Sequence, residues 1–423
     1  MMTEKSEGRS PKSERNPKPE ARREWHRLSF GFRCSVFGFL SDFGLRISDF
    51  LREMYQNFVV VVLGVAFFSL FALASAASFK VVSAEPAPEL NRLYDRTNGW
   101  VGADANYSVP FSSNRTLLFF GDTWIGNIVN SLRTNVVMIN NSAGVLHHDA
   151  TRRIDFFWRT NAGGKATGIF LPEDGRGFMW PFGGVCVSNT LHIVLFQMET
   201  TKAGGAFGFR NVAVWLASVT NAQDSPVQWS ITQQRLPFTE LDDARKIFFG
   251  AAMLRHGEHV YVYGTEEQPK EKNFGRRMIL ARADVAVVSD FSRWEFFAEG
   301  AWRKDFKKVM PLATAVPTES SVTFMPALNR FVFVGNGDFL SPRILARTAP
   351  DPWGPWSEPV TLYECPDVKL SKEVFCYAGK AHPSLSSNDE LVISYAANSF
   401  SFAEVVNDAR LYWPRFVRVK VGW

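Results

Sequence analysis

The fold is decided by a short apolar segment that first occurs as Leu117-Leu118-Phe119-Phe120-Gly121-Asp122. Its leucine and phenylalanine residues follow one another without polar interruption, and a glycine and a polar residue end the run. Such a segment is typical of a strand that is buried on both faces. Four more segments of this kind follow along the chain, at residues 193–197, 260–264, 331–335 and 391–395.

The five segments begin 76, 67, 71 and 60 residues apart. Each one follows a turn signal and another apolar strand. Most precede a third strand, which we expect at residues 134–140, 212–219, 278–283, 343–348 and 416–421. A near-constant spacing indicates a repeat fold, and short antiparallel strands with glycine and proline turns favour propeller blades over a sandwich. The sequence therefore predicts an all-β fold, a five-bladed β-propeller with about four antiparallel strands per blade.

Composition limits the partners that the chain can have. Its 423 residues are 46% hydrophobic, which is enough for a large core, and its four cysteines exclude a disulfide scaffold. The net charge is +5, but residues 1–53 hold 11 Lys and Arg against 8 Asp and Glu. Residues 85–423 are thus almost neutral. Nucleic-acid binding usually requires a concentrated basic face, so we expect no nucleic-acid partner.

The N-terminal part of the chain has the composition of a targeting sequence. Residues 1–53 are predicted to be disordered, or to be a mis-annotated extension if translation begins at Met54. Residues 54–84 contain an uncharged apolar run at 58–77 and small residues around Ala76 and Ala84. This pattern predicts a signal peptide cut after one of these two alanines, or an uncleaved N-terminal membrane anchor.

Export follows from either alternative. We therefore expect residues 85–423 to form the propeller domain in a secreted, periplasmic or cell-surface protein, with membrane contact only through an uncleaved N-terminal segment. An oxidising compartment favours disulfides. Cys365 and Cys376 are close in sequence and flank a predicted connection between strands, so they are the disulfide candidates.

Ring closure predicts where function lies. In every blade, the start of the first strand and the end of the second meet at the same mouth of the central channel, so side chains far apart in sequence converge there. The candidates for catalysis are Asp104, Asp122 and Glu319, and those for substrate binding are Arg133, Trp180, Lys380, His382 and Asn398. Carboxylates accept hydrogen bonds from hydroxyl groups and tryptophan stacks on sugar rings, so we expect a polysaccharide or oligosaccharide ligand.

Paired carboxyl groups are the groups that cleave glycosidic bonds: one protonates the leaving oxygen and the other activates water or attacks directly. We expect Asp104 to be the base, Glu319 the acid and Asp122 an orienting or pKa-tuning group. No metal or redox cofactor is needed for this chemistry. Four of the candidates also have structural interpretations: a turn cap for Asp122, a loop or cap for Glu319, blade packing for Trp180 and a structural hydrogen bond for His382.

Several motifs together resemble an uncharacterised family of exported bacterial five-bladed propellers. They are Trp100–Pro110, Phe119–Gly126, Lys380–Ser386 and Trp413–Val417. That family is similar to glycoside hydrolases of the arabinanase, levansucrase and invertase superfamily. The resemblance covers essentially all of the predicted mature region and implies a base at an aspartate of the first inner strand. Asp104 occupies that position, flanked by alanines where those enzymes have His and Pro.

Two functions remain compatible with these residues. The first is an exported glycoside hydrolase that uses carboxylates at the mouth of the channel. The second is a non-catalytic glycan-binding or surface-scaffold propeller, in which the same carboxylates only form hydrogen bonds to sugar.

Overall fold

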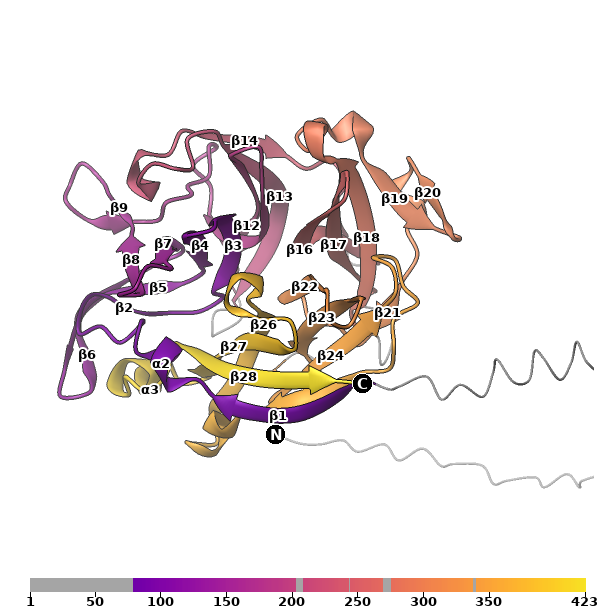
Figure 1. Cartoon of the computed structure of the whole chain (residues 1–423). Helices are drawn as coiled ribbons and strands as arrows, with labels where there is room; N and C mark the ends of the chain where they lie inside the picture. The colour runs from indigo at the N-terminus through magenta and orange to yellow at the C-terminus, as the bar shows by residue number, and fades with distance from the viewer. Residues whose placement is uncertain (1–78, 203–207, 243, 269–274, 338–339) are drawn as a thin grey trace, which may run out of the picture. The chain divides into compact units, whose positions relative to one another are not determined.

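The computed structural model describes residues 79–202, 208–242, 244–268, 275–337 and 340–423 (Figure 1). The predicted extension at 1–53 and residues 54–78 of the predicted export segment lie outside this part. The chain divides into two units, Met1–Ala76 and Ala77–Trp423, and the description below concerns the second. Among the described residues, none forms a helix with the length and apolar character needed to cross a membrane.

Antiparallel sheets dominate the described part of the chain. Five of them have four or more strands, in the spatial orders β3-β4-β7-β8, β11-β12-β13-β14, β15-β16-β17-β18-β19-β20 with β21 beside β18, β22-β23-β24-β25 and β1-β28-β27-β26. Two smaller sheets have the orders β2-β5-β6 and β10-β9. The protein is therefore all-β, as expected.

The strands have the following bounds: β1 Lys80–Pro86, β2 Asn98–Ala103, β3 Tyr107–Ser112, β4 Arg115–Phe120, β5 Thr123–Val129, β6 Leu132–Ile139, β7 Ser142–His147, β8 Arg153–Phe157, β9 Arg159–Thr160, β10 Ala166–Thr167, β11 Phe178–Val187, β12 Thr190–Thr200, β13 Phe209–Val219, β14 Ile231–Arg235, β15 Glu240–Leu241, β16 Lys246–His256, β17 His259–Glu267, β18 Arg277–Asp284, β19 Glu295–Ala298, β20 Ala301–Arg303, β21 Ala313–Thr314, β22 Ser320–Met325, β23 Arg330–Asn336, β24 Arg343–Ala349, β25 Val360–Glu364, β26 Val374–Ala381, β27 Glu390–Ser399 and β28 Pro414–Gly422. The helices are short: α2 Pro88–Asn91, α3 Phe402–Asn407, and the 3₁₀ turns η1 Pro226–Gln228, η2 Val285–Val287, η3 Phe291–Arg293, η4 Phe306–Lys308, η5 Pro366–Lys369 and η6 Pro383–Leu385.

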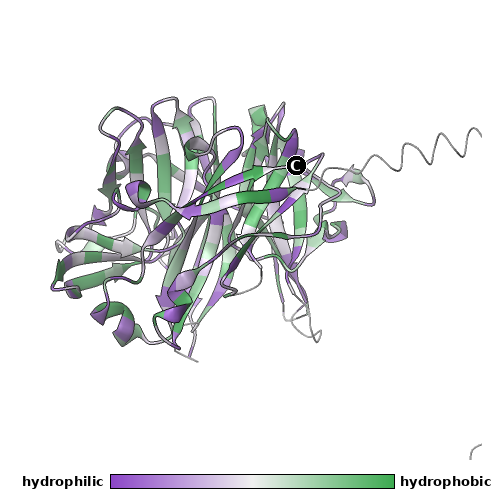
Figure 2. Cartoon of the chain, turned by 60° about the horizontal axis from the view of Figure 1, so that its bottom comes forward, coloured by the Kyte–Doolittle hydropathy of each residue, from purple (hydrophilic) through white to green (hydrophobic). Residues whose placement is uncertain are grey.

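The five segments that predicted the fold are strands β4, β12, β17, β23 and β27. Each pairs on both sides within its sheet, and the sheet faces are covered by neighbouring sheets. The strands are therefore buried almost throughout; Val260–Thr265 of β17 are an example. In Figure 2 apolar residues follow the strands and polar residues gather in the connections. Uninterrupted apolar sequence corresponds here to burial on both faces.

The first strands of the five large sheets contact one another in series. Contacts join β3 to β11, β11 to β16, β16 to β22 and β22 to β26, and η6 after β26 returns to β3. The sheets accordingly surround a common centre (Figure 1). Glycines in bulges of the first strands allow this close approach. A Cβ at Gly183 would lie 2.8 Å from the backbone of Ala252 in the next sheet, and Gly250, with φ +112°, lies against Val194.

The first of these sheets differs from the prediction. The sequence predicts its third strand at residues 134–140, but residues 134–139 belong to β6, which pairs with β5 in a separate sheet. The third strand is instead β7, and β8 follows it. The physical reason is an inserted hairpin. Asn130 and Ser131, with φ 50° and 64°, form the two-residue turn that joins β5 to β6, a conformation that matches the twist of a hairpin.

The last sheet includes residues that precede the predicted domain boundary at residue 85. Strand β1, Lys80–Pro86, pairs with the C-terminal strand β28 over six positions. Phe79, directly before it, is 7% exposed and packs in the core of this sheet. Residues 80–84 therefore belong to the sheet rather than to the export segment. A signal-peptide cut after Ala76 leaves β1 intact, whereas a cut after Ala84 removes five of its seven residues.

Candidate active site

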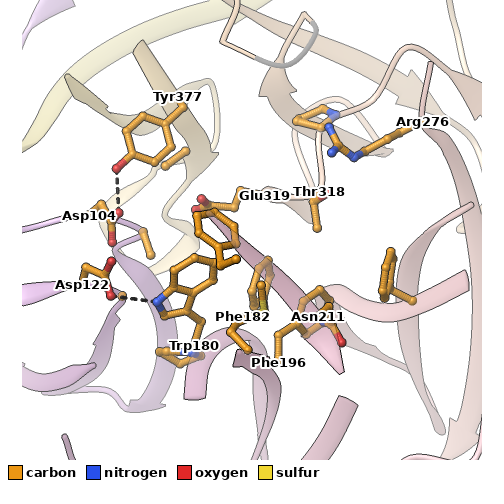
Figure 3. Close-up of a pocket in the computed structure, with 18 of the residues that line it drawn as sticks. Asp104, Asp122, Trp180, Phe182, Phe196, Asn211, Arg276, Thr318, Glu319 and Tyr377 are labelled. Carbon is orange, nitrogen blue, oxygen red and sulfur yellow. Dashed lines mark hydrogen bonds between the residues drawn. The ribbon is translucent and has the colours of Figure 1, made fainter. Parts of the chain in front are cut away.

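A cavity of about 960 Å³ lies where the first strands meet. Each of the five large sheets contributes to its lining (Figure 3). Asp104 precedes β3, Trp180 lies on β11, Lys246 begins β16, Glu319 directly precedes β22 and Tyr377 lies on β26. The convergence of strand ends at one opening, expected for ring closure, is thus what the structure shows for these side chains.

Asp104 occupies the connection between β2 and β3 at one end of the cavity. Its Oδ2 atom accepts hydrogen bonds from the hydroxyl groups of Tyr377, at 2.6 Å, and Tyr412, at 3.0 Å. The side-chain amide of Asn398 donates in turn to the Tyr377 hydroxyl, at 3.4 Å. The carboxyl group is therefore held in one orientation by donors from two distant segments of the chain.

Asp122 follows β4 and lies beside Asp104. Its Oδ1 accepts hydrogen bonds from Trp180 Nε1 at 2.9 Å and Asn140 Nδ2 at 3.1 Å. The two aspartates are linked through the backbone, because Asp104 N–H donates to Asp122 C=O at 3.3 Å. In Figure 3 the two carboxyl groups face each other. Gly121 makes the contact possible, since a Cβ at this position would collide with the Asp104 carboxyl.

Burial and mutual repulsion change the protonation of this pair. The pKa of Asp104 is raised well above its ordinary value, first by loss of hydration and then by the charges of Asp122 and Glu319. Burial raises the pKa of Asp122 to about 6, against the opposing hydrogen bonds from Trp180 and Asn140. Two carboxyl groups this close do not ionise independently, so the pair retains a proton at a pH where isolated aspartates are fully ionised.

Glu319, on the other side of Asp104, forms an ion pair with Lys380 (Nζ–Oε2 3.1 Å). Lys380 is 1% exposed, and its ammonium also donates to the carbonyl oxygens of Ala105, at 2.5 Å, and Ala378, at 2.7 Å. All three donors are thereby used inside the protein. Lys380 does not line the cavity, and its expected contact with substrate stays a prediction. It positions Glu319 and the backbone beside Asp104.

Four residues around Asp104 have strained backbone conformations. Ala105, Asn106, Ala378 and Tyr412 have φ values of 64°, 58°, 59° and 68°, in the left-handed region that non-glycine residues rarely adopt. The ammonium of Lys380 binds the carbonyl oxygens of two of them. Such strain persists only where surrounding contacts impose it, and it is characteristic of functional sites.

Two further candidates form hydrogen bonds inside the protein. Arg133 is 3% exposed, and its guanidinium donates to four backbone carbonyl oxygens, including those of Val101 and Leu411. It fixes the segment that carries Tyr412. His382 is fully buried and hydrogen-bonded to Ser108 and Ser394, at 2.9 and 2.7 Å. Burial and then the charge of Lys380 lower its pKa to about 3. Neither residue lines the cavity, and ligand contact by either one stays a prediction.

The remaining five candidates, Asp104, Asp122, Glu319, Trp180 and Asn398, do line it. The sequence analysis missed the tyrosines at 377 and 412 and the aromatic wall formed by Phe182, Phe196 and Phe248. A signal for the wall was present, because alternate residues of a strand share a face. Trp180 and Phe182 alternate on β11, as Phe375 and Tyr377 do on β26. The sequence contains no such signal for Tyr412, because the position of Tyr412 depends on the hydrogen bonds of Arg133.

Cys365 and Cys376 are buried free thiols in the structure. A hydrogen bond from one thiol to the other, followed by burial, raises the pKa of Cys365. The contact places the two sulfur atoms together, and their oxidation to a disulfide stays a prediction. Within the described residues, no group of three or more His, Cys, Asp or Glu side chains is arranged to hold a metal ion.

The chain is therefore an all-β protein whose sheets surround a cavity with acidic and aromatic lining residues. The chain belongs to the family described as "Domain of unknown function (DUF5005)", whose model matches residues 88–423. A comparison with curated proteins gives no match. The sequence motifs resemble an uncharacterised family, and the family that matches likewise has no assigned function.

Solved structures include relatives of this fold. A Bacteroides ovatus protein described as "a putative hydrolase" has a TM-score of 0.63 and 18% identity, over 79% of this chain and 90% of that one. A thermostable family-43 glycoside hydrolase has a TM-score of 0.41 and 12% identity, over 77% and 91%. A glycosyl hydrolase from Bacteroides ovatus has 0.42 and 11%, over 80% and 94%. The first likeness shows the fold alone, and the other two are too distant to carry an argument.

Proposed function

We propose that this protein is an exported five-bladed β-propeller that hydrolyses glycosidic bonds in a polysaccharide or oligosaccharide. The observation that carries the proposal is the set of three carboxyl groups, Asp104, Asp122 and Glu319, at one end of a cavity with aromatic walls. The five large sheets and the serial contacts of their first strands support the blade count.

Hydrolysis requires one carboxyl group that holds a proton and one that is ionised. The raised pKa values of Asp104 and Asp122 support their pair as the proton donor. The ion pair with Lys380 supports Glu319 as the carboxylate. This assignment reverses the roles that the sequence led us to expect for Asp104 and Glu319, because both effects depend on contacts that only the fold creates.

In the proposed reaction, the Asp104–Asp122 pair transfers its proton to the glycosidic oxygen as the bond from that oxygen to the anomeric carbon breaks. Glu319 accepts a proton from the water molecule that forms the new bond to the anomeric carbon. The positive charge that develops on the sugar ring lies among carboxyl groups, and Trp180 offers an aromatic face to it. Protonation of the pair is restored from solvent through the open cavity.

The experiment compares Asp104→Asn and Glu319→Gln in the full-length protein, on a panel of polysaccharides and of aryl glycosides with dinitrophenolate leaving groups. Removing the acid should reduce hydrolysis of natural glycans by about 10²–10⁴-fold, but should spare the aryl glycosides, because their leaving group needs no proton. Removing the base should impair both substrates. His148→Asn, at a partly exposed histidine outside the cavity lining, is the control and should behave as wild type.

The alternative of a non-catalytic glycan-binding propeller gives a different result. Wild-type protein would then bind a glycan and release no reducing ends from any member of the panel. If instead the Asp104 variant lost activity on aryl glycosides while the Glu319 variant retained it, hydrolysis would stand and the two roles would return to those expected from the sequence.

A further inference from the structure

The cavity has a second end, which the acid chemistry does not use. Arg210 on β13, Lys246 on β16 and Arg276 before β18 line it. In Figure 3 Arg276 and Asn211 lie across the cavity from Asp104 and Asp122. The cavity therefore has carboxyl groups at one end and cationic side chains at the other.

The strand geometry explains why Lys246 faces the cavity. It lies two residues before Phe248 on β16, and alternate residues share a face of a strand; both line the cavity. Phe248 continues an aromatic wall, because its ring lies 5.6 Å from that of Phe196, which stacks on Phe182 at 3.9 Å. The wall begins next to Trp180, on the same strand as Phe182, and so joins the acidic end to the cationic end.

Two of the three cations at the second end are paired with carboxylates. Arg276 is paired with Glu267 at 2.5 Å, and Arg210 with Glu199 at 3.1 Å. Lys246 faces Glu267 across the β16–β17 pairing, yet its side chain has no hydrogen-bond or ion-pair partner among the residues that the structure describes. Of these three cations, Lys246 is therefore the one without a partner in the described part of the chain, and it lines the cavity together with Phe248.

We propose that the substrate is an acidic oligosaccharide. It would carry a carboxylate or sulfate ester on a sugar away from the cleaved bond, and Lys246 would select that group. The inference rests on the proposed function and names its substrate class. A negative group at the acidic end would be repelled by Asp104, Asp122 and Glu319, whereas at the other end it meets an unpaired ammonium. Complementary and repulsive charges together fix the direction in which the chain of sugars lies.

The test measures binding without turnover, in the full-length protein carrying Asp104→Asn. The probes are oligogalacturonate with its methyl ester, and a sulfated galactan oligosaccharide that contains no uronic acid with its desulfated form. Isothermal titration calorimetry should show tighter binding of the charged member of at least one pair, weakening as salt rises. The two pairs distinguish carboxylate from sulfate. Adding Lys246→Met should weaken the charged probe about fivefold and leave the neutral probe unchanged.

Matched variants separate charge from packing. Lys246→Arg retains the charge and should retain the preference, and Lys420→Met, at an exposed lysine of β28 that pairs with Asp389, should change nothing. Equal affinity for the charged and neutral members of both pairs, or a Lys246→Met protein that still prefers the charged member, overturns the inference.

Failure of this inference is distinguishable from failure of the proposed function. If wild-type protein hydrolyses a neutral glycan at a rate that Lys246→Met does not alter, the hydrolase stands and the acidic substrate does not. If the charged probe binds in a Lys246-dependent way while wild-type protein cleaves no glycan, the cationic subsite stands and the hydrolase does not.

Discussion

Lys380 illustrates how one buried charge can organise a site without touching its ligand. Its ammonium joins the carbonyl oxygens of Ala105 and Ala378 to the carboxylate of Glu319. Ala105 precedes β3, Glu319 precedes β22 and Ala378 lies on β26, so the three groups come from segments next to or within three different sheets. Both alanines have left-handed backbones, which cost free energy that the hydrogen bonds offset. From its sequence neighbourhood Lys380 was an equally good candidate for sugar contact, because nothing local reveals which carbonyls it will meet.

Replacing this residue distinguishes the two roles. We expect Lys380→Met to lower the free energy of unfolding by about 3 kcal/mol, because it leaves Glu319 and two strained carbonyl groups without their donor. Urea denaturation followed by tryptophan fluorescence measures this loss. A residue that only contacts sugar would leave the unfolding midpoint unchanged and weaken ligand binding instead.

The elements were largely predictable, because each second strand is buried on both faces and so has an uninterrupted apolar sequence. Strand β1 was not. Its residues, Lys80–Pro86, alternate little and stay mostly exposed, so they lack the signal of a central strand and follow directly on an apolar export-like run. Only its partner, β28, shows that it is a strand. Pairing across the ends of the chain carries no local signature.

We expect β1 to be essential to the stability of the last sheet. A chain that begins at Glu85 loses most of β1 and also Phe79, which is buried against the core. It should be at least 3 kcal/mol less stable than a chain that begins at Ala77, judged from the usual cost of removing a buried phenylalanine. Thermal unfolding of the two chains, with Phe79→Ala as an intermediate, gives the comparison. Equal midpoints would show that β1 is dispensable.

At the scale of the whole molecule, the packing of the five large sheets brings two carboxyl groups of like charge together in the cavity. The folded-state pKa values of Asp104 and Asp122 lie above their unfolded values. At Asp122, whose pKa in the folded protein is about 6, the folded protein therefore binds more protons than the unfolded chain between about pH 4 and pH 6. Stability from Asp122 is fully present below this window and is lost as the pH rises through it, and Asp104, whose pKa is raised in the same direction, adds to that loss.

Removing the pair should reverse that loss. The variant Asp104→Asn/Asp122→Asn should gain stability relative to wild type as pH rises from 4 to 7, by on the order of 1 kcal/mol, since the open cavity keeps the carboxyl groups partly solvated. Denaturant unfolding at several pH values measures the difference between the two proteins, which cancels the titration of surface carboxylates. Parallel curves would show that the two aspartates do not repel each other in the folded state.

The sequence by itself determined the all-β class, the five central strands and the five candidates that line the cavity. Burial on two faces requires an uninterrupted apolar run, and polar residues at the ends of repeated strands are visible in the local sequence. Tertiary structure alone decided which polar residues became internal supports. In the sequence, Arg133, Lys380 and His382 look like any polar residue that could bind a ligand. In the folded protein their side chains form hydrogen bonds with carbonyl and hydroxyl groups from distant parts of the chain. It also decided the protonation of Asp104, since a pKa depends on the hydration and charges that folding brings around a carboxyl group.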